Sequence, residues 1–102
     1  MTVLAAVDQQ HTIDVLAELA ARGLPRLGWH LSEVTVDRLD GQVGPGSDEE
    51  KRQSIAAWAN FLGGEPVERR YEHHTSLSVT ATYRGVLVRI YTHVAQCSAV
   101  VA

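Results

Sequence analysis

The last third of the chain alternates between apolar and polar residues, and a period of two predicts β-strands. Residues 66 to 94 carry this pattern, with a short interruption at Arg84-Gly85. A two-residue turn at that point brings apolar residues opposite one another, because the register decides which side chains share a face. The expected pairs are Tyr83 with Val86, Ala81 with Val88, and Val79 with Ile90.

The same argument from parity places the turn that precedes this hairpin. Only a loop with an odd number of residues keeps Tyr71 on the face of Val79. A loop at His74-Thr75-Ser76 sets Tyr71 beside Val79 and His73 beside Leu77. The sequence therefore predicts a three-stranded antiparallel meander with one face covered by helices.

Helical spacing of apolar residues predicts a first helix over Ile13–Arg22. The apolar positions are 13, 16, 17, 20 and 24. Gly23 suits a left-handed C-cap, and Pro25 prevents the helix from continuing. On the polar side, Glu18 and Arg22 stand in the favoured order for an ion pair four residues apart. We interpret this side as a solvated helix face.

A second helix is predicted to begin after Ser47. Ser47 and Glu50 form a capping box, and the acidic residues that follow the cap suit the positive end of the helix dipole. The buried stripe is expected to consist of Ile55, Trp58, Ala59 and Leu62, and Gly63-Gly64 would end the helix. Trp29 and Trp58 are interpreted as core residues.

The segments between these elements give weaker signals. Thr2–Val7 is interpreted as a short buried strand or an apolar lead-in. Trp29–Leu39 is β-like, but its apolar parity changes, so we expect a bulge or break near Ser32-Glu33. Asp40-Gly41 is typical of a turn, and a loop over Gly41–Gly46 would follow it.

Composition indicates a single domain. The chain has 102 residues, of which 45% are hydrophobic and 21% charged, as is usual for a globular protein. We expect residues 1–102 to form one α+β domain, with two helices packed on one face of an antiparallel sheet that ends in the meander. The net charge of −3 provides no overall attraction for nucleic acid, and the one cysteine, Cys97, excludes an intramolecular disulfide.

The first residues do not resemble a secretory signal. Met1–Asp8 lacks a basic region, and its apolar run is short. The longest apolar runs are far below the ~20 residues that a membrane helix needs. We therefore expect a cytoplasmic protein that does not bind a membrane.

The histidines are the first candidates for a metal or catalytic site. In a strand, His73 would point toward the helix-covered face, while His74 would lie at the turn with a bias toward the other face. His74 and His93 would share the open face at a separation of roughly 10 Å, or two strand spacings. We expect a polar strand end and no metal site, and a pH-sensitive or interface role stays open as an alternative.

Motifs for catalysis or cofactor binding are missing from the sequence. It contains no G-x-S-x-G elbow and no H-E-x-x-H pair. The glycines of Gly41–Gly46 lack the Lys of a phosphate-binding loop, and Asp48–Glu50 place negative charge where a phosphate would dock. We therefore assign no catalytic residue, metal ligand or cofactor. The sequence favours a protein that is not an enzyme and leaves that question open.

The open face of the predicted sheet is the candidate binding surface. The expected register places Arg70, Thr80 and Arg89 in one cross-strand row, and Glu72, Ser78 and Tyr91 in the next. Tyr and Arg are favoured at protein interfaces. The candidate binding residues are therefore Arg70, Arg89, Tyr91 and His74.

Three stretches of the chain resemble small uncharacterised proteins of actinobacteria and their phages. They are Leu24-Pro25 ahead of Trp29, the helix end Trp58–Gly63, and the hairpin segment Leu77–Val86. These stretches are structural motifs, so the resemblance implies no activity, and no functional residue is carried over from it.

Three hypotheses for the function follow. The leading one is a non-catalytic protein-interaction or regulatory accessory module, which forms a homodimer or binds a protein partner. It would use the edge of the last strand or the Arg70/Arg89/Tyr91 face, beside the apolar tail Ala99–Ala102. The second is nucleic-acid binding through the arginines Arg69, Arg70, Arg84 and Arg89, which Glu68 and Glu72 argue against. The third is a small-molecule binder or enzyme with a pocket between helices and sheet.

Overall fold

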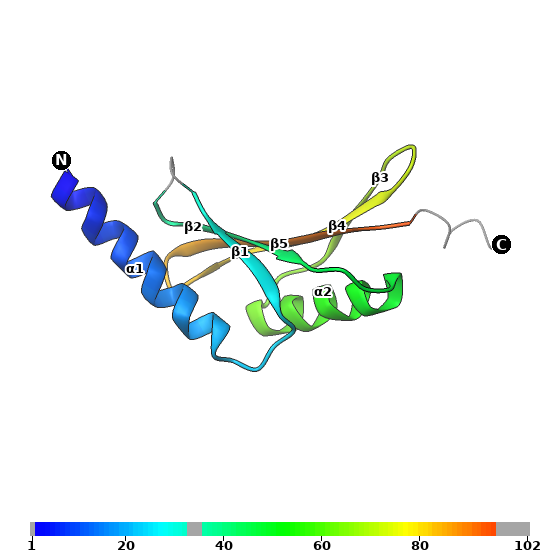
Figure 1. Cartoon of the computed structure of the whole chain (residues 1–102), viewed down its shortest axis with the longest axis horizontal. Coiled ribbons are helices and arrows are strands. Elements are labelled where there is room, and N and C mark those ends of the chain that lie inside the picture. The colour runs from blue at the N-terminus through cyan, green and yellow to red at the C-terminus, as the bar shows by residue number, and fades with distance from the viewer. Residues whose placement is uncertain (1, 33–35, 96–102) are drawn as a thin grey trace.

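The chain folds into a sheet with both helices on one side, as the computed structural model shows (Figure 1). The structure describes residues 2–32 and 36–95, so Cys97 and the tail Ala99–Ala102 lie outside the described residues. The elements are α1 (Thr2–Ala20), β1 (Leu27–Leu31), β2 (Arg38–Val43), α2 (Asp48–Leu62), β3 (Val67–Arg70), β4 (Thr75–Tyr83) and β5 (Val86–Val94). No helix in the described part of the chain is both long and apolar enough to cross a membrane.

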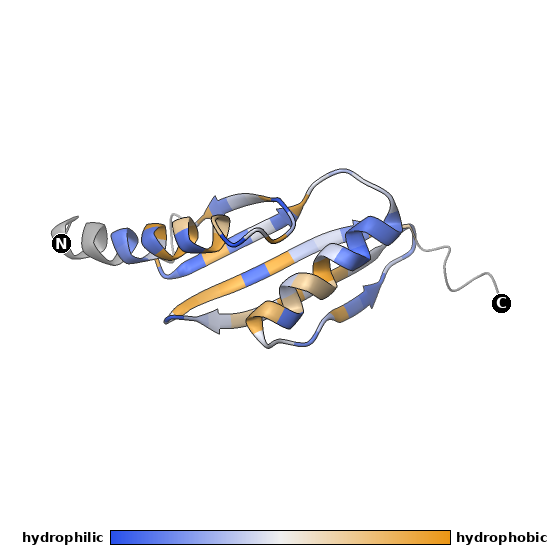
Figure 2. Ribbon diagram, turned by 90° about the horizontal axis from the view of Figure 1, so that it is seen from below, coloured by the Kyte–Doolittle hydropathy of each residue, from blue (hydrophilic) through white to orange (hydrophobic). Residues whose placement is uncertain are grey.

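The α+β class is confirmed, but the sheet is mixed instead of purely antiparallel. Its strands lie in the order β1-β2-β5-β4-β3. The strands β3, β4 and β5 form the expected antiparallel meander, and β5 then pairs with β2 in parallel. The reason is that α2 links β2 to the meander, whose third strand returns beside β2 in the same direction. Figure 2 shows α1 and α2 on the same side of this sheet.

Helix α1 is longer than the sequence pattern suggested. The expectation of a strand or lead-in at Thr2–Val7 is wrong, because these residues form the first turns of α1. The chain contains no Gly or Pro between Thr2 and Arg22, so no residue of very low helix propensity ends the helix in this segment. The buried side also differs from the expected one: Val15 and Leu19 are buried, whereas Ile13 is 42% exposed.

The region before α2 is a hairpin of two strands. Of the two alternatives expected for Trp29–Leu39, a bulge or a break, the structure has the break, since β1 ends at Leu31 and β2 begins at Arg38. Asp40-Gly41 lies inside β2 and is not a turn. Gly41 occurs there for packing: a Cβ atom at this position would come within 2.9 Å of Leu27 and 3.1 Å of Trp29.

Helix α2 agrees closely with the expectation. The Ser47 hydroxyl accepts from the Glu50 N–H at 3.1 Å, and the Glu50 carboxylate accepts from the Ser47 N–H at 2.9 Å. The helix ends at Gly63, whose φ of 77° is the left-handed conformation that glycine adopts at low cost. Ile55, Trp58 and Ala59 are buried, and Leu62 is half-buried at the edge of the core.

The core lies between the helices and the inner side of β4 and β5. Val79, Val88 and Ile90 are fully buried there, together with Val15 of α1 and Trp58 of α2. The indole N–H of Trp58 donates to the carbonyl oxygen of Pro25 at 2.9 Å, which satisfies its polar atom. The core role expected for Trp58 is therefore confirmed. Trp29 packs edge-on against it, at 5.6 Å between ring centroids.

The register of the β4–β5 hairpin is confirmed residue by residue. Tyr83 pairs with Val86, Ala81 with Val88, and Val79 with Ile90. Arg84 and Gly85 both have positive φ, 53° and 83°, as the tight turns that match the strand twist require.

The register expected for β3 is wrong. The loop before β4 consists of residues 71–74, and it closes with a hydrogen bond from the Tyr71 N–H to the His74 carbonyl at 2.8 Å. Thr75, which was expected in the loop, belongs to β4 and pairs with Arg70 of β3. A loop of even length reverses the parity of β3, so Arg70 moves to the helix-covered side and Arg69 moves to the open side.

Candidate functional site: the open face of the sheet

The sheet has one face that no described helix or strand covers, and we call it the open face (Figure 1). Alternation along each strand assigns its side chains, because successive residues point to opposite sides. The buried residues Leu39, Val79, Val88 and Ile90 mark the other side. The pairing registers place on the open face Gly28, His30, Arg38, Asp40, Gln42, Val67, Arg69, Ser76, Ser78, Thr80, Thr82, Leu87, Arg89, Tyr91 and His93.

Ring contacts connect five side chains into a continuous row, which we call the aromatic stripe. The Arg89 guanidinium lies over the Tyr91 ring at 4.7 Å from its centroid, and Tyr91 is 6.4 Å from the His93 ring. His93 meets His74 edge-on at 4.8 Å, and His74 stacks on Tyr71 at 4.9 Å. The stripe runs from the middle of β5 to the loop between β3 and β4.

The structure brings together most of the expected binding residues, though not all. Arg89, Tyr91 and His74 belong to the aromatic stripe. The expected neighbours Thr80 with Arg89 and Ser78 with Tyr91 are confirmed as cross-strand pairs. Arg70 is not part of this surface, because its partner Thr75 points into the covered side with 2% exposure. Glu72 lies in the loop after β3 and not beside Ser78.

The distance expected between His74 and His93 is also wrong. Their ring centroids are 4.8 Å apart instead of roughly two strand spacings, because His74 directly precedes β4, whose Thr75 and Ser76 pair with Val94 and His93 of the neighbouring strand β5. Two imidazoles alone do not complete a zinc site, which needs further ligands. The described residues hold no group of at least three His, Cys, Asp or Glu side chains arranged as metal ligands.

Positive charge on the open face exceeds negative charge. Arg38, Arg69 and Arg89 lie on this face, and Asp40 is the single acidic residue among its described side chains. Asp40 is engaged by Arg38 at 3.3 Å. Within the described part of the chain, neither Arg69 nor Arg89 forms an ion pair with a carboxylate.

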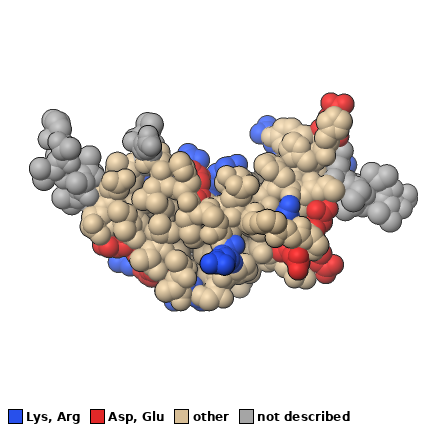
Figure 3. Space-filling model, viewed as in Figure 1, with Lys and Arg blue, Asp and Glu red and all other residues tan. Residues whose placement is uncertain are grey.

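The acidic residues gather elsewhere. Glu68 points to the covered side, where it pairs with Arg52 of α2 at 3.4 Å. Asp48, Glu49 and Glu50 occupy the first turn of α2. Figure 3 shows red side chains over this end of α2, below the sheet; along the upper outline it shows several blue side chains, with red at the tip of the β3–β4 hairpin. The argument that Glu68 neutralises the sheet-face arginines therefore does not hold.

A polar network on the covered side fixes α1 to the β4–β5 turn. The Tyr83 hydroxyl donates to Glu18 at 2.7 Å, and Arg84 also binds this carboxylate. Arg22 forms the expected ion pair with Glu18 at 3.1 Å. The hydrogen bond from Tyr83 and the contact with Arg84 lower the pKa of Glu18 to about 2. This network is structural, since its members are occupied with one another.

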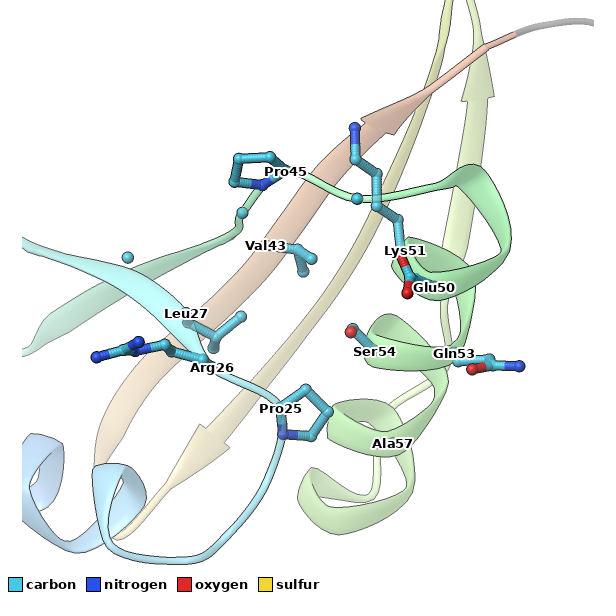
Figure 4. Close-up of a pocket in the computed structure, with 13 residues that line it drawn as sticks. Pro25, Arg26, Leu27, Val43, Pro45, Glu50, Lys51, Gln53, Ser54 and Ala57 are labelled. Atoms are coloured by element: carbon cyan, nitrogen blue, oxygen red, sulfur yellow. The ribbon is translucent and has the colours of Figure 1, made fainter.

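A pocket lies on the covered side, between α2 and the ends of the β1–β2 hairpin (Figure 4). Its volume is about 850 Å³, and its apolar walls include Pro25, Leu27 and Val43. Several polar groups at its rim already have protein partners. Glu50 closes the capping box, and the Lys51 ammonium donates to the His93 carbonyl at 3.0 Å. The pocket therefore offers shape and apolar surface but few polar groups to fix a ligand.

Sequence reasoning placed Arg69 on the wrong face, left Tyr71 out of the binding surface, and raised a pocket as a hypothesis without locating it. The sequence did contain a signal for Arg69. Thr75, Leu77 and Val79 alternate with polar residues, so β4 can begin at Thr75. The loop before β4 then has an even number of residues, which places Arg69 on the open face. The pocket has no such signal, because its walls come from separate parts of the chain.

Comparisons of the chain with protein-family models, with curated proteins and with solved structures returned no match.

Proposed function

We propose that this protein is a non-catalytic binding module whose open sheet face is the binding surface. It would serve as an interaction or regulatory accessory protein in a cytoplasmic system of a bacterium or phage. The observation that carries the proposal is the aromatic stripe, which lies on an uncovered face beside arginines without carboxylate partners.

The composition of this face supports a binding role. Tyr71 is 45% exposed, Leu87 37% and Val67 59%, so large side chains remain in contact with water. Tyr and Arg are enriched among the residues that dominate binding energy at interfaces. The stripe is held in place by contacts among its own members, which reduces the entropy lost when a partner binds.

A second copy of the chain is one of the protein partners considered. The edge of β5 is not available for such a contact, because β5 lies between β2 and β4 and pairs with both. A homodimer would instead join two open faces or use the outer edge of β1 or β3. Light scattering at micromolar concentration would then give twice the mass of one chain.

A small-molecule binder or enzyme is the second candidate, and the pocket between α2 and the β1–β2 hairpin favours it. The volume of about 850 Å³ suits a small organic ligand. Ser54 and Ala57 of α2 line the pocket and are only half-buried, so a larger side chain there would fill it without disturbing the core.

Affinity capture from an extract of the source organism separates the two candidates. The baits are the wild type, the open-face variant Arg89→Glu/Tyr91→Ala and the pocket variant Ala57→Phe. We expect the open-face variant to lose the captured molecule and the pocket variant to keep it. Loss from the pocket variant alone would contradict the proposal. Melting curves of the three baits verify that each is folded.

A further inference from the structure

The chemistry of the open face points to one class of partner, and the argument rests on the proposed function of that face. We propose that the open face binds single-stranded nucleic acid. The proposal combines three observations: segregated positive charge, a row of planar groups, and hydroxyl side chains between them.

Charge is the first observation. The whole chain carries a net charge of −3, yet the open face holds Arg38, Arg69 and Arg89 against Asp40. Asp40 is neutralised by Arg38, and in the described residues no carboxylate pairs with Arg69 or with Arg89, whose guanidinium lies over the Tyr91 ring. A polyanion gains from such a surface by releasing its counterions. The acidic residues of α2 on the other side direct a polyanion toward the open face.

The planar groups are the second observation. Tyr71, His74, His93 and Tyr91 follow one another at 4.9, 4.8 and 6.4 Å between ring centroids. Bases of a single strand stack on aromatic side chains irrespective of sequence, and each stacked base contributes substantially to affinity. Proteins that bind unpaired bases on a sheet face use aromatic residues in this way. A peptide backbone carries no comparable series of aromatic bases.

Hydroxyl groups on β4 are the third observation. Ser76, Ser78 and Thr80 face the open side, directly beside His93, Tyr91 and Arg89 of β5. Ser and Thr side chains donate hydrogen bonds to phosphate oxygens and to base edges. Each row across the two strands therefore joins a hydroxyl to a ring or a guanidinium.

The shape of the surface favours a single strand over a duplex. Reading the bases of a duplex in its major groove requires a helix or a ribbon that enters the groove. The described element that projects furthest from the open side is the β3–β4 hairpin (Figure 1), and the Glu72 side chain in its loop is 87% exposed. If this hairpin entered a groove, the Glu72 carboxylate at its tip would lie between two rows of phosphates, which disfavours a duplex.

Arg69 and Arg70 provide a matched pair for the test. They are adjacent, both are exposed, and they point to opposite sides of β3. Arg69→Glu and Arg70→Glu change the net charge equally, so their long-range effects on a polyanion are the same. The difference between them reports direct contact with the open face.

Fluorescence anisotropy with labelled oligothymidylate and oligouridylate of about 12 nucleotides measures the binding. We expect wild-type binding that falls steeply between about 50 and 200 mM salt. Arg69→Glu should weaken it by about tenfold or more and Arg70→Glu by no more than about threefold. Tyr91→Ala should weaken it by at least about fivefold, whereas Tyr91→Phe, which keeps the ring, should bind like the wild type.

Four results would overturn the inference. The first is no binding of either oligonucleotide at about 50 mM salt. The second is equal loss in Arg69→Glu and Arg70→Glu, which would reveal a nonspecific charge effect. The third is equal or tighter binding of a duplex of the same sequence. The fourth is displacement of the oligonucleotide by polyglutamate at equal charge concentration, which would indicate an acidic protein partner.

The proposed function is tested separately. If the oligonucleotides do not bind but a protein captured from the extract is lost in Arg89→Glu/Tyr91→Ala, the open face remains a binding surface and the inference alone fails. If the capture is also insensitive to that variant, both fail.

Discussion

On β5, the side chains of Val88 and Ile90 are fully buried under the helices, whereas Arg89 and Tyr91, which alternate with them, point to the open side. Val88 and Ile90 belong to the hydrophobic core, whereas Arg89 and Tyr91 provide a positive charge, an aromatic ring and hydrogen-bonding groups. The same strands therefore carry the information for stability on one face and the chemistry for binding on the other. Substitutions of neighbouring residues on these strands should separate the two properties.

The largest expected difference is between Val79→Asp and Thr80→Asp. Val79 is fully buried, and a charge without a partner at this position costs several kcal/mol, enough to unfold a small domain. Thr80 is exposed on the open face, so the same charge there should change the unfolding free energy by less than about 0.5 kcal/mol. Ile90→Asp should behave like Val79→Asp. Thermal melting followed by circular dichroism measures the stability of each variant. A melting curve of Val79→Asp that matches the wild type would contradict the assignment of faces.

A smaller difference is expected between two glycines of the β1–β2 hairpin. A Cβ atom at Gly41 would come within 2.9 Å of Leu27, 3.1 Å of Ile90 and 3.1 Å of Trp29. Gly41→Ala should therefore lower the unfolding free energy by about 1–3 kcal/mol. At Gly28, on the open side, the nearest atom is 3.8 Å away, so Gly28→Ala should cause no loss. Urea titration measures both, and equal effects would refute the distinction.

The smallest effect concerns the acid stability of the covered side. The pKa of Glu18 in the folded protein is lowered to about 2, from 4.5. A lowered pKa means that Glu18 contributes stability above pH 4.5, and that this contribution is lost as the pH falls from 4.5 toward 2. Glu18→Gln should therefore be less stable than wild type at pH 7 and should lose less stability on acidification. Melting temperatures measured at several pH values test this, and parallel pH profiles would contradict it.

Local patterns predicted much of the covered side. The capping box of Ser47 and Glu50 defined the start of α2, and alternation around Arg84-Gly85 defined the β4–β5 register. Both signals lie within a few residues of the structure that they specify. The parallel pairing of β2 with β5 joins residues almost fifty positions apart, as in Gln42 with Tyr91, and no local pattern encodes it.

The open face was predicted only in part, for a physical reason. Arg89 and Tyr91 were identified because the β4–β5 register is fixed by apolar pairs. Arg70 was misplaced because β3 is exposed along its whole length, so no buried residue determines its parity.

The buried side of α1 was predicted incorrectly because Ala17 and Ala20 were counted as apolar residues of the core. Both alanines are exposed, and the residues that are buried are Val15 and Leu19.

The most direct test of the division between the two faces is a titration followed by nuclear magnetic resonance. The ring signals of Tyr91 and His93 report on the open face, and the indole N–H of Trp58, bonded to Pro25 at the pocket, reports on the covered side. On addition of oligothymidylate, the Tyr91 and His93 signals should shift progressively while the Trp58 signal stays in place. A shift of the Trp58 signal without shifts at Tyr91 and His93 would contradict the account.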